Sequence, residues 1–342
     1  MVSDLNLDTF EKHSQESTMK KIAFLLIAAG ILQITACKND GTTQQTTPTD
    51  TTTKPVINAP AFDAENAYKF IETQVAFGPR VPGTLAQKKC AAWIESEIKK
   101  YADTVYIQKT TVSQPISNKK YPCINIIGSI NPAATQRVLL LAHWDSRPWA
   151  DQDIKDQNKP IDAADDGGSG VAVMLEIAAK LKQQKPSIGV DFLFTDAEDV
   201  GKTEWTDESY CLGTQYWARN PHVAGYKAKF GICLDMVGAK GALFPLEAFS
   251  KYYAPDAQKQ IWDIGNRLGY SAYFSYNDGG QITDDHIPIN EISKIPCVDI
   301  INLQYTGFGT HWHTHNDNIQ IIDKNTLKAV GQTVLQTLYE VE

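Results

Sequence analysis

Ionisable side chains recur where short apolar runs of this sequence end. They are His143, Asp145, Glu198, Asp199 and Asp235, which follow the runs at 137–142, 190–194 and 230–234. Taken one at a time, such residues usually belong to solvated turns or surface loops. Several carboxylates gathered at one edge would repel each other, however, and a bound cation removes that repulsion. Their repetition at successive strand ends therefore predicts a metal site.

Other breaks in the apolar pattern also carry ionisable residues. They are Asp165, Asp166, Asp284, Asp285, His286, His311, His313 and His315. Asp166 has an alternative role, because it could cap the helix that follows it. Carboxylates combined with imidazoles suit a catalytic zinc ion that has three protein ligands and one open position. An all-oxygen site would instead favour calcium or magnesium.

Glu198 and Asp199 are adjacent, and this arrangement predicts two different roles. Neighbouring residues that leave a strand point in different directions. One of the two can therefore bind the metal, while the other faces the substrate as a general base.

The elements that must position these residues alternate between strands and helices. Apolar runs predict strands at 105–112, 124–130, 137–142, 190–194, 230–234 and 295–301. Apolar residues at helical spacing predict helices at 64–74, 85–101, 168–182, 255–268 and 324–340. This alternation predicts one α/β domain, with a central mixed, mostly parallel sheet and helices on both faces. Such sheets bind ligands at the carboxyl ends of their strands, where the candidate residues stand.

The composition excludes two broad classes of protein. The sequence has 32 Lys and Arg against 40 Asp and Glu, a net charge of −8, which argues against nucleic acid as a partner. Hydrophobic residues make up 42% of the chain, which is enough for a full core and excludes wholesale disorder.

The region up to Cys37 has the features of an export signal. Met19 and a basic pair precede the apolar run 22–36, which is shorter than the roughly 20 residues that span a bilayer. Met19 is therefore a plausible start, with residues 1–18 an artefact of gene calling. The run ends in ITAC, which resembles the lipobox of bacterial lipoproteins, whose cysteine is acylated. A plain signal peptide with a nearby cysteine is the alternative.

Residues 38–59 are rich in threonine and proline and carry no core pattern, which predicts a flexible tether. We therefore expect an exported protein that is lipid-anchored through Cys37 in the bacterial envelope and faces the periplasm or the cell surface. The catalytic domain would span residues 60–342.

The remaining cysteines are Cys90, Cys123, Cys211, Cys233 and Cys297. Their number is odd, so at least one thiol is free even in an oxidising compartment. Their spacing contains no C-x-x-C pair, which argues against a thiolate zinc site. Cys233 and Cys297 lie in apolar runs and are expected in the core, and no disulfide pairing is predicted.

Five segments together resemble the zinc aminopeptidase superfamily of the co-catalytic type. They contain His143-x-Asp145, Asp166 in ADDGGSGVA, Glu198-Asp199, Asp235 in CLDMVG and His313 in WHT. Their order and approximate spacing match over nearly all of residues 60–342.

Two details within this superfamily resemble the glutaminyl cyclases. Asp284 begins the sequence DDHIPI, which is similar to the DDHIP signature of those enzymes. Trp312 stands directly before His313, where aminopeptidases more often carry tyrosine. The resemblance implies a zinc-dependent enzyme that converts the N-terminal Gln of peptides or proteins to pyroglutamate and releases ammonia.

The cyclase resemblance also implies a ligand set of Asp166, Asp199 and His313 around a single zinc ion, with water completing the shell. The residue at 199 is Glu in many relatives. Because Asp is shorter, the metal must lie closer to this strand, or the loop must shift.

The same resemblance assigns the catalytic and substrate-binding groups. Glu198 would be the general acid and base, in a hydrogen-bonded carboxylate network with Asp235 and Asp284. Trp312 would form a wall of the substrate pocket, with Trp205 as a second aromatic.

A second metal ion is the main alternative. His143 and Asp235 occupy the positions that hold it in aminopeptidases, and Asp145 would then orient His143. We favour one zinc, because Asp284 supplies another partner for Asp235. A dinuclear zinc aminopeptidase, and a tethered binding lipoprotein with a degenerate site, remain the competing hypotheses.

Overall fold

The computed structural model describes residues 58–202, 204–305 and 307–341. The predicted signal region that ends at Cys37, and the tether as far as residue 57, lie outside the described residues. Within the described ranges, no helix is both long and apolar enough to cross a bilayer.

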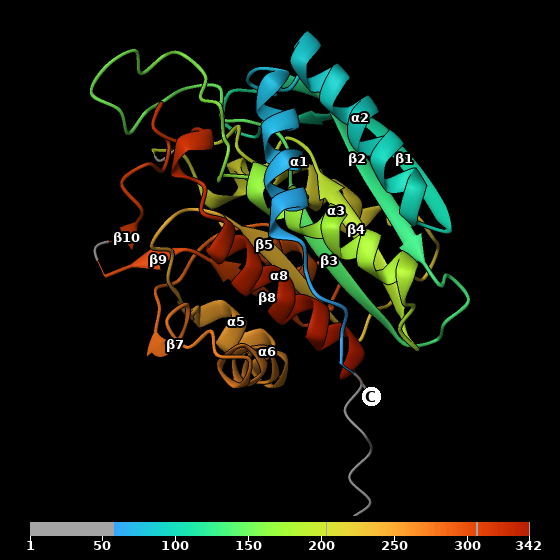
Figure 1. The fold of residues 1–342 in the computed structure, drawn as a ribbon. Helices are drawn as coiled ribbons and strands as arrows, with labels where there is room; N and C mark the ends of the chain where they lie inside the picture. The colour runs from blue at the N-terminus through green and yellow to red at the C-terminus, as the bar shows by residue number, and fades with distance from the viewer. Residues whose placement is uncertain (1–57, 203, 306, 342) are drawn as a thin grey trace, which may run out of the picture. The chain divides into compact units, whose positions relative to one another are not determined.

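A six-stranded mixed sheet forms the centre of the structure (Figure 1). Its strands are β1 (Thr104–Ser113), β2 (Lys120–Ile130), β3 (Arg137–His143), β4 (Gly189–Thr195), β5 (Phe230–Asp235) and β8 (Cys297–Ile301). Their order across the sheet is β1-β2-β4-β3-β5-β8. The first two pairings are antiparallel and the other three are parallel. The predicted α/β fold with a mixed, mostly parallel sheet is confirmed.

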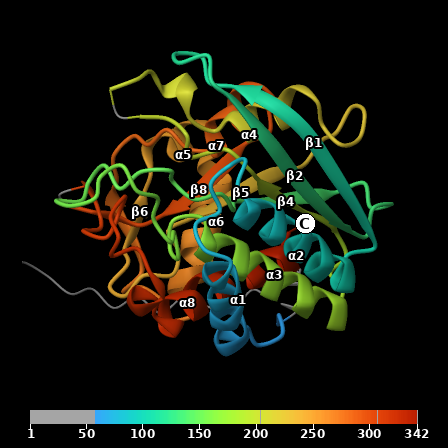
Figure 2. The same cartoon turned by 90° about the horizontal axis from the view of Figure 1, so that it is seen from above.

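Helices cover both faces of this sheet. They are α1 (Ala64–Ala76), α2 (Leu85–Tyr101), α3 (Gly168–Gln183), α4 (Leu212–Arg219), α5 (Ala248–Tyr253), α6 (Pro255–Arg267), α7 (His286–Glu291) and α8 (Lys324–Tyr339). In Figure 2, α1, α2, α3 and α8 lie on one side of the sheet, and α4 and α7 lie on the other. Near the β8 edge, α5 and α6 pack against each other and against β8. Shorter elements are β6 (Phe244–Leu246), β7 (Phe274–Asp278), β9 (Leu303–Gln304), β10 (Gly307–Phe308), η1 (Asp207–Ser209) and η2 (Ile319–Ile321).

The side chains of each strand point alternately to the two faces of the sheet, so the apolar core lies on both faces. On β3, Leu140 packs into the larger apolar cluster beneath α1, α2, α3 and α8, whereas Leu139 and Leu141 point to the opposite cluster. That opposite cluster contains Trp217 of α4 and Ile289 of α7. Because successive strand side chains point to opposite faces, one continuous apolar run can serve both layers.

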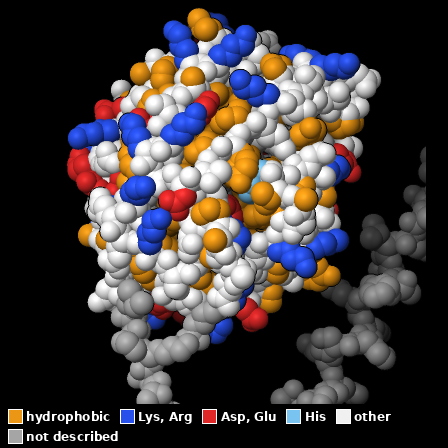
Figure 3. All heavy atoms as spheres, turned by 90° about the vertical axis from the view of Figure 1, so that its right-hand side faces the viewer, with side chains coloured by type: hydrophobic (Ala, Val, Ile, Leu, Met, Phe, Trp, Pro, Cys, Tyr) orange, Lys and Arg blue, Asp and Glu red, His pale blue; other side chains and the backbone are white. Residues whose placement is uncertain are grey.

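The ends of the parallel strands bring the ionisable residues to one edge. β3 ends at His143 and β5 ends at Asp235, while β4 ends at Thr195, just before Glu198. α3 begins at Gly168, directly after Asp166 and Gly167. Figure 3 shows a different face, the right-hand side of Figure 1, on which hydrophobic side chains gather around a histidine, with Lys and Arg side chains around them.

The predicted elements are confirmed with small shifts at their ends. The last strand starts at Cys297 rather than at residue 295, because Pro296 cannot donate a ladder hydrogen bond. The expected core positions of Cys233 and Cys297 are also confirmed. All five cysteines of the described residues are buried and free.

Candidate active site

The cavity at the carboxyl edge of the sheet has a volume of about 450 Å³. It is lined by Asp166, Glu198, Asp199, Trp205, Asp207, Tyr210, Asp235, Met236, Phe249, Gln281, Ile282, Thr283, Asp284, Ile301, Phe308, Trp312 and His313. Eight residues named as the main site candidates from sequence therefore share one cavity: Asp166, Glu198, Asp199, Trp205, Asp235, Asp284, Trp312 and His313.

Asp166, Asp199 and His313 form a compact group of metal-binding atoms. One ligand atom from each lies within 4.8 Å of the other two, and all three residues are buried. Burial lowers the pKa of His313, which keeps the imidazole in the neutral form that binds metals. The Oδ2 atom of Asp199 is buried and has no hydrogen-bond partner within the described residues. Two carboxylates and one neutral imidazole fit a zinc ion with an open position.

The backbone around Asp166 is fixed by Asp317, which sequence reasoning missed. The carboxylate of Asp317 accepts hydrogen bonds from the backbone N–H of Asp165 at 2.7 Å and of Asp166 at 3.1 Å. Asp166 does not cap α3, because the N-cap residue is Gly167 and no side chain bonds the cap. The capping alternative is therefore wrong, and the Asp166 carboxylate is free to face the cavity.

Asp145 holds the turn that carries Glu198 and Asp199. Its Oδ1 accepts the backbone N–H of Glu198 at 3.0 Å, and its Oδ2 accepts that of Asp199 at 3.2 Å. Ala197 before them has a φ of 57°, so the chain turns sharply after β4. Asp145 also lies 3.4 Å from His143 Nδ1. Its contact with His143 was expected only for the second-metal alternative, and its support of the Glu198 turn was not expected.

Glu198 is 8% exposed and lies beside Asp284 and Cys211, with ligand atoms of the three within 4.8 Å of one another. The Cys211 thiol donates to Glu198 Oε1 at 3.4 Å. Burial raises the pKa of Glu198 well above its usual value, and the nearby charges of Asp199 and Asp284 raise it further. A carboxyl group whose pKa is raised in this way is suited both to accept and to deliver a proton.

Asp235 and Asp284 are also reluctant to ionise. Burial, followed by the charge of Asp235, raises the pKa of Asp284 to about 7. The pKa of Asp235 is raised to about 6, again chiefly by burial. Behind Asp284, the Cys233 thiol donates to its Oδ2 at 3.5 Å, and the buried Asp299 lies close by. The raised pKa of Asp284 therefore places a carboxyl group that readily holds a proton beside Glu198.

A second group of possible metal ligands shares Asp166 with the first. His143, Asp166 and Asp235 place one ligand atom each within 4.8 Å of one another. His143 Nε2 is 3.0 Å from Asp166 Oδ1 and 3.3 Å from Asp235 Oδ1. Burial alone would lower the pKa of His143, but the surrounding carboxylates outweigh it and raise this pKa well above its usual value.

Aromatic rings form one side of the cavity. The Trp312 ring stacks on His313 with centroids 3.7 Å apart, and Phe308 lies 4.4 Å from Trp312. Trp205 meets Trp149 edge-on at 6.5 Å. The structure therefore brings both predicted tryptophans, Trp312 and Trp205, to the cavity, with Phe308 as a third ring that the sequence did not indicate.

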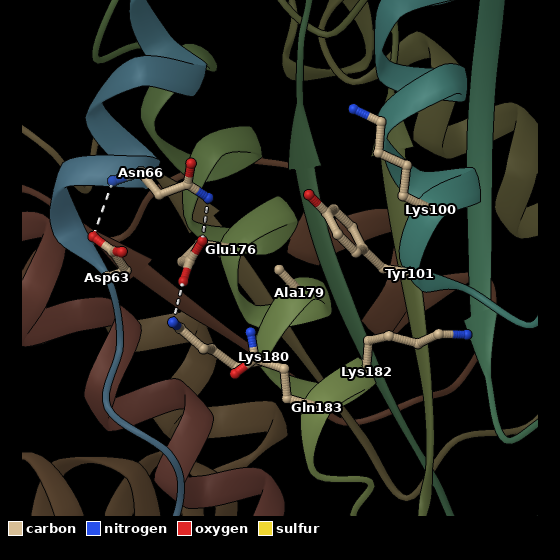
Figure 4. A pocket seen from close by; sticks show the side chains of 9 residues that line it. All are labelled: Asp63, Asn66, Lys100, Tyr101, Glu176, Ala179, Lys180, Lys182 and Gln183. Atoms are coloured by element: carbon tan, nitrogen blue, oxygen red, sulfur yellow. Dashed lines mark hydrogen bonds and ion pairs between the residues drawn. The ribbon is translucent and has the colours of Figure 1, made fainter.

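A second cavity, of about 370 Å³, lies between α1, α2 and α3 (Figure 4). Its buried carboxylate, Glu176, is bound by Asn66 Nδ2 at 2.6 Å and by Lys180 Nζ at 3.1 Å. The contact with Asn66 joins helix α1 to α3, whereas the contact with Lys180 lies within α3. No group of potential metal ligands in the described residues lies in this cavity, so we place the active site at the sheet edge.

The sequence pattern of peptidase family M28 matches residues 125–338. The chain belongs to peptidase family M28. The matched range contains every residue of both groups of possible metal ligands.

Solved structures resemble the chain closely. A glutaminyl cyclase from Porphyromonas gingivalis is 51% identical, over 82% of this chain and 99% of that chain, with a TM-score of 0.80. A Zn-dependent exopeptidase from Parabacteroides distasonis is 47% identical, over 83% of this chain and 100% of that chain, with a TM-score of 0.80. The predicted resemblance to bacterial glutaminyl cyclases is confirmed.

Relatives matched by sequence are more distant. The glutaminyl-peptide cyclotransferase of Gloydius blomhoffii is 27% identical over 240 residues, which is 61% of this chain. The match spans 62% of the length of that relative.

Proposed function

We propose that this M28 protein is a glutaminyl-peptide cyclotransferase. The substrate is a peptide or protein with N-terminal Gln. Its α-amine attacks the γ-carboxamide carbon, a C–N bond closes the five-membered lactam, and the bond to the amide nitrogen breaks. The products are the pyroglutamyl peptide and ammonia. The identity to a glutaminyl cyclase supports this assignment.

We assign one zinc ion to Asp166, Asp199 and His313. The buried, unpaired Oδ2 of Asp199 and the neutral imidazole of His313 fit such an ion. When bound, zinc supplies Lewis-acid polarisation of the γ-carbonyl.

Glu198 carries the proton transfers in this proposal. It accepts a proton from the attacking α-nitrogen and delivers one to the departing amide nitrogen. Asp284 lies beside Glu198 and helps to keep its proton affinity high, and the charge of Asp235 in turn raises the pKa of Asp284. Because the reaction is intramolecular, the enzyme needs to orient the substrate rather than to activate a water nucleophile.

The aromatic wall performs that orientation. Trp312 and Phe308 present flat apolar surfaces beside His313, and Trp205 lines the same cavity. A Gln side chain folded back toward its own α-amine would pack on these surfaces, which excludes water and shortens the distance of attack.

The single observation that carries the proposal is the buried Glu198 beside Asp284, in the cavity that also holds the three proposed zinc ligands. Glu198→Gln should lower ammonia release from a Gln-initiated peptide by about 10²- to 10⁴-fold, the usual contribution of general acid–base catalysis. Zinc content should remain unchanged. Glu204→Gln, the same isosteric change at an exposed residue, should retain activity within about twofold. Near-normal turnover in Glu198→Gln would refute the role given to Glu198.

A dinuclear zinc aminopeptidase is the second candidate function. The group of His143, Asp166 and Asp235 favours it, because these residues provide ligands for a second ion. In that case Glu198 would activate a water molecule for peptide hydrolysis. A metal count on the purified protein separates the two candidates: two tightly bound ions per chain would favour the aminopeptidase, and one would favour the cyclase.

We also propose that the protein is exported and held at the bacterial envelope by lipid on Cys37. The signal-like run 22–36 and the Thr/Pro-rich stretch 38–59 support this proposal. Cys37→Ala should abolish incorporation of radiolabelled palmitate and release the domain from the membrane fraction. Equal labelling of the variant would contradict the proposed anchor.

A further inference from the structure

Arg147 is a fully buried cation next to the proposed zinc ligands. Its guanidinium binds Asp151 through two contacts, Nε to Oδ1 at 2.7 Å and Nη2 to Oδ2 at 2.6 Å. Its Nη1 also donates to Oδ1 of Asp199. Paired, parallel contacts of this kind fix the orientation of both partners. Arg147 therefore ties Asp199 to Asp151 in one rigid arrangement.

Asp151 in turn reaches the second ligand. Its Oδ1 lies 3.4 Å from Nδ1 of His313. The backbone N–H of the next residue, Gln152, donates to the carbonyl of His313 at 3.2 Å. His313 has a φ of 55°, a conformation that a non-glycine residue keeps only when its surroundings hold it. Residues 151 and 152 thus hold both the ring and the backbone of His313.

We propose that Arg147 and Asp151 are positioning residues that hold Asp199 and His313 in place to bind the metal. Arg147 occupies one oxygen of Asp199 and leaves Oδ2 without a hydrogen-bond partner in the described part of the chain. Asp151 faces Nδ1 of His313 and leaves Nε2 available to a metal ion. Nε2 lies 3.6 Å from carboxylate oxygens of Asp166 and Asp199. Each ligand therefore keeps one atom that neither Arg147 nor Asp151 binds, Oδ2 of Asp199 and Nε2 of His313.

The charges agree with this role. Arg147 lies between the carboxylates of Asp199 and Asp151, and its positive charge offsets the repulsion between Asp199 and Asp166 before a cation binds. A short Asp side chain at 199 has fewer rotatable bonds than Glu, so one fixed contact is enough to set its direction. The anchored guanidinium supplies that contact.

The same two segments provide a matched control. Asp153 and His315 stand two residues after Asp151 and His313, and Asp153 Oδ2 lies 2.9 Å from His315 Nδ1. This second Asp–His pair contributes no residue to the cavity or to either group of possible metal ligands. Asp153→Asn breaks the same kind of contact between the same segments without touching a proposed ligand.

The test measures zinc affinity by competition with a chromophoric chelator, for the full chain and for Asp151→Asn, Arg147→Lys and Asp153→Asn. We expect Asp151→Asn and Arg147→Lys to weaken zinc binding by about 10- to 100-fold, as loss of a residue that orients a ligand does. Asp153→Asn should stay within about twofold of the original protein. The visible absorption of the Co²⁺ form should change in Asp151→Asn and remain unchanged in Asp153→Asn.

This inference rests on the zinc site in the proposed function, and the outcomes separate the two. If the unaltered protein binds no zinc, the site itself is refuted, and the inference falls with it. If the unaltered protein binds zinc, and Asp151→Asn and Arg147→Lys bind zinc with the same affinity, only the positioning role is overturned. Thermal unfolding of the metal-free variants shows whether any of them has lost the fold. If Asp151→Asn does not fold, Arg147→Lys, which keeps the positive charge, still tests the positioning role.

Discussion

The residues around Glu198 set how readily it binds a proton. Burial contributes most to its raised pKa, and the carboxylates of Asp199 and Asp284 add to it. Only the deprotonated form of Glu198 can accept the proton of the attacking amine, so activity should rise as the pH passes the pKa of this group.

Asp284→Asn removes one of the charges that raise the pKa of Glu198. We therefore expect the acid limb of the pH profile of kcat/KM to move to lower pH, with a lower plateau because the shared proton network is lost. Asp278→Asn changes an exposed carboxylate and should leave the profile unchanged. An acid limb that stays in place in Asp284→Asn would contradict the proposed coupling.

Residue types and their order were enough to predict eight of the cavity residues, but not the residues that hold them in place. Glu198 and Asp199 could be predicted because they follow an apolar strand and carry a recognisable motif. Arg147 and Asp317 could not, since each stands in a polar stretch that is typical of a loop. Their roles arise from contacts with residues more than fifty positions away. Cys211 was missed for the same reason, because a thiol in sequence does not reveal that it faces Glu198.

At the scale of elements, the turn before α3 must pass close to β3. Gly167 has a φ of 83°, and a Cβ atom there would lie 2.7 Å from the ring of His143. Position 167 therefore requires glycine for two reasons: the backbone is left-handed, and there is no room for a side chain. Gly78, at the end of α1, has the same φ of 83° but no atom within 4 Å of such a Cβ.

Gly167→Ala and Gly78→Ala separate these two requirements. Gly78→Ala should cost about 1 kcal/mol of unfolding free energy, the penalty of a left-handed backbone alone. Gly167→Ala should cost a further 1–3 kcal/mol or so, because the His143 ring must move. Urea unfolding of the two variants measures the difference. Equal losses of stability would show that the contact with His143 has no energetic weight.

The apolar pattern of the sequence predicted the long helices and strands, but it did not predict the short helices. α5 and α7 have 6 residues each and α4 has 8, fewer than the three turns over which helical spacing becomes visible. α7 also contains Pro288, which normally ends a helix. The proline is tolerated because it lies in the first turn of α7, where backbone N–H groups have no hydrogen-bond partner within the helix.

The whole molecule gathers acidic groups at one edge of its sheet. Glu198, Asp235 and Asp284 all have raised pKa values in the absence of a bound cation, chiefly because of burial. An unfolded chain exposes the same groups to water, where Asp and Glu ionise near pH 4. Folding of the metal-free protein therefore takes up protons.

The stability of the metal-free protein should follow from this proton uptake. The pKa of Asp284 is about 7 in the folded state, against about 3.9 when unfolded. The contribution of Asp284 to the free energy of unfolding is fully present below about pH 4 and is lost as the pH rises through about 7. Urea unfolding of chelator-treated protein should give a lower free energy of unfolding at neutral pH than at mildly acidic pH. In Asp284→Asn this pH-dependent loss should be smaller. The same loss in both proteins would rule out Asp284 as its source.

The mass spectrum of a Gln-initiated peptide, recorded after incubation with the zinc-loaded protein, tests the central claim most directly. A glutaminyl cyclase should yield a peptide of full length that has lost one ammonia and can no longer react at its N-terminus. Glu198→Gln should leave the peptide unchanged. Release of free Gln with a shortened peptide would contradict the cyclase assignment and favour the dinuclear aminopeptidase, with His143 and Asp235 as ligands of the second ion.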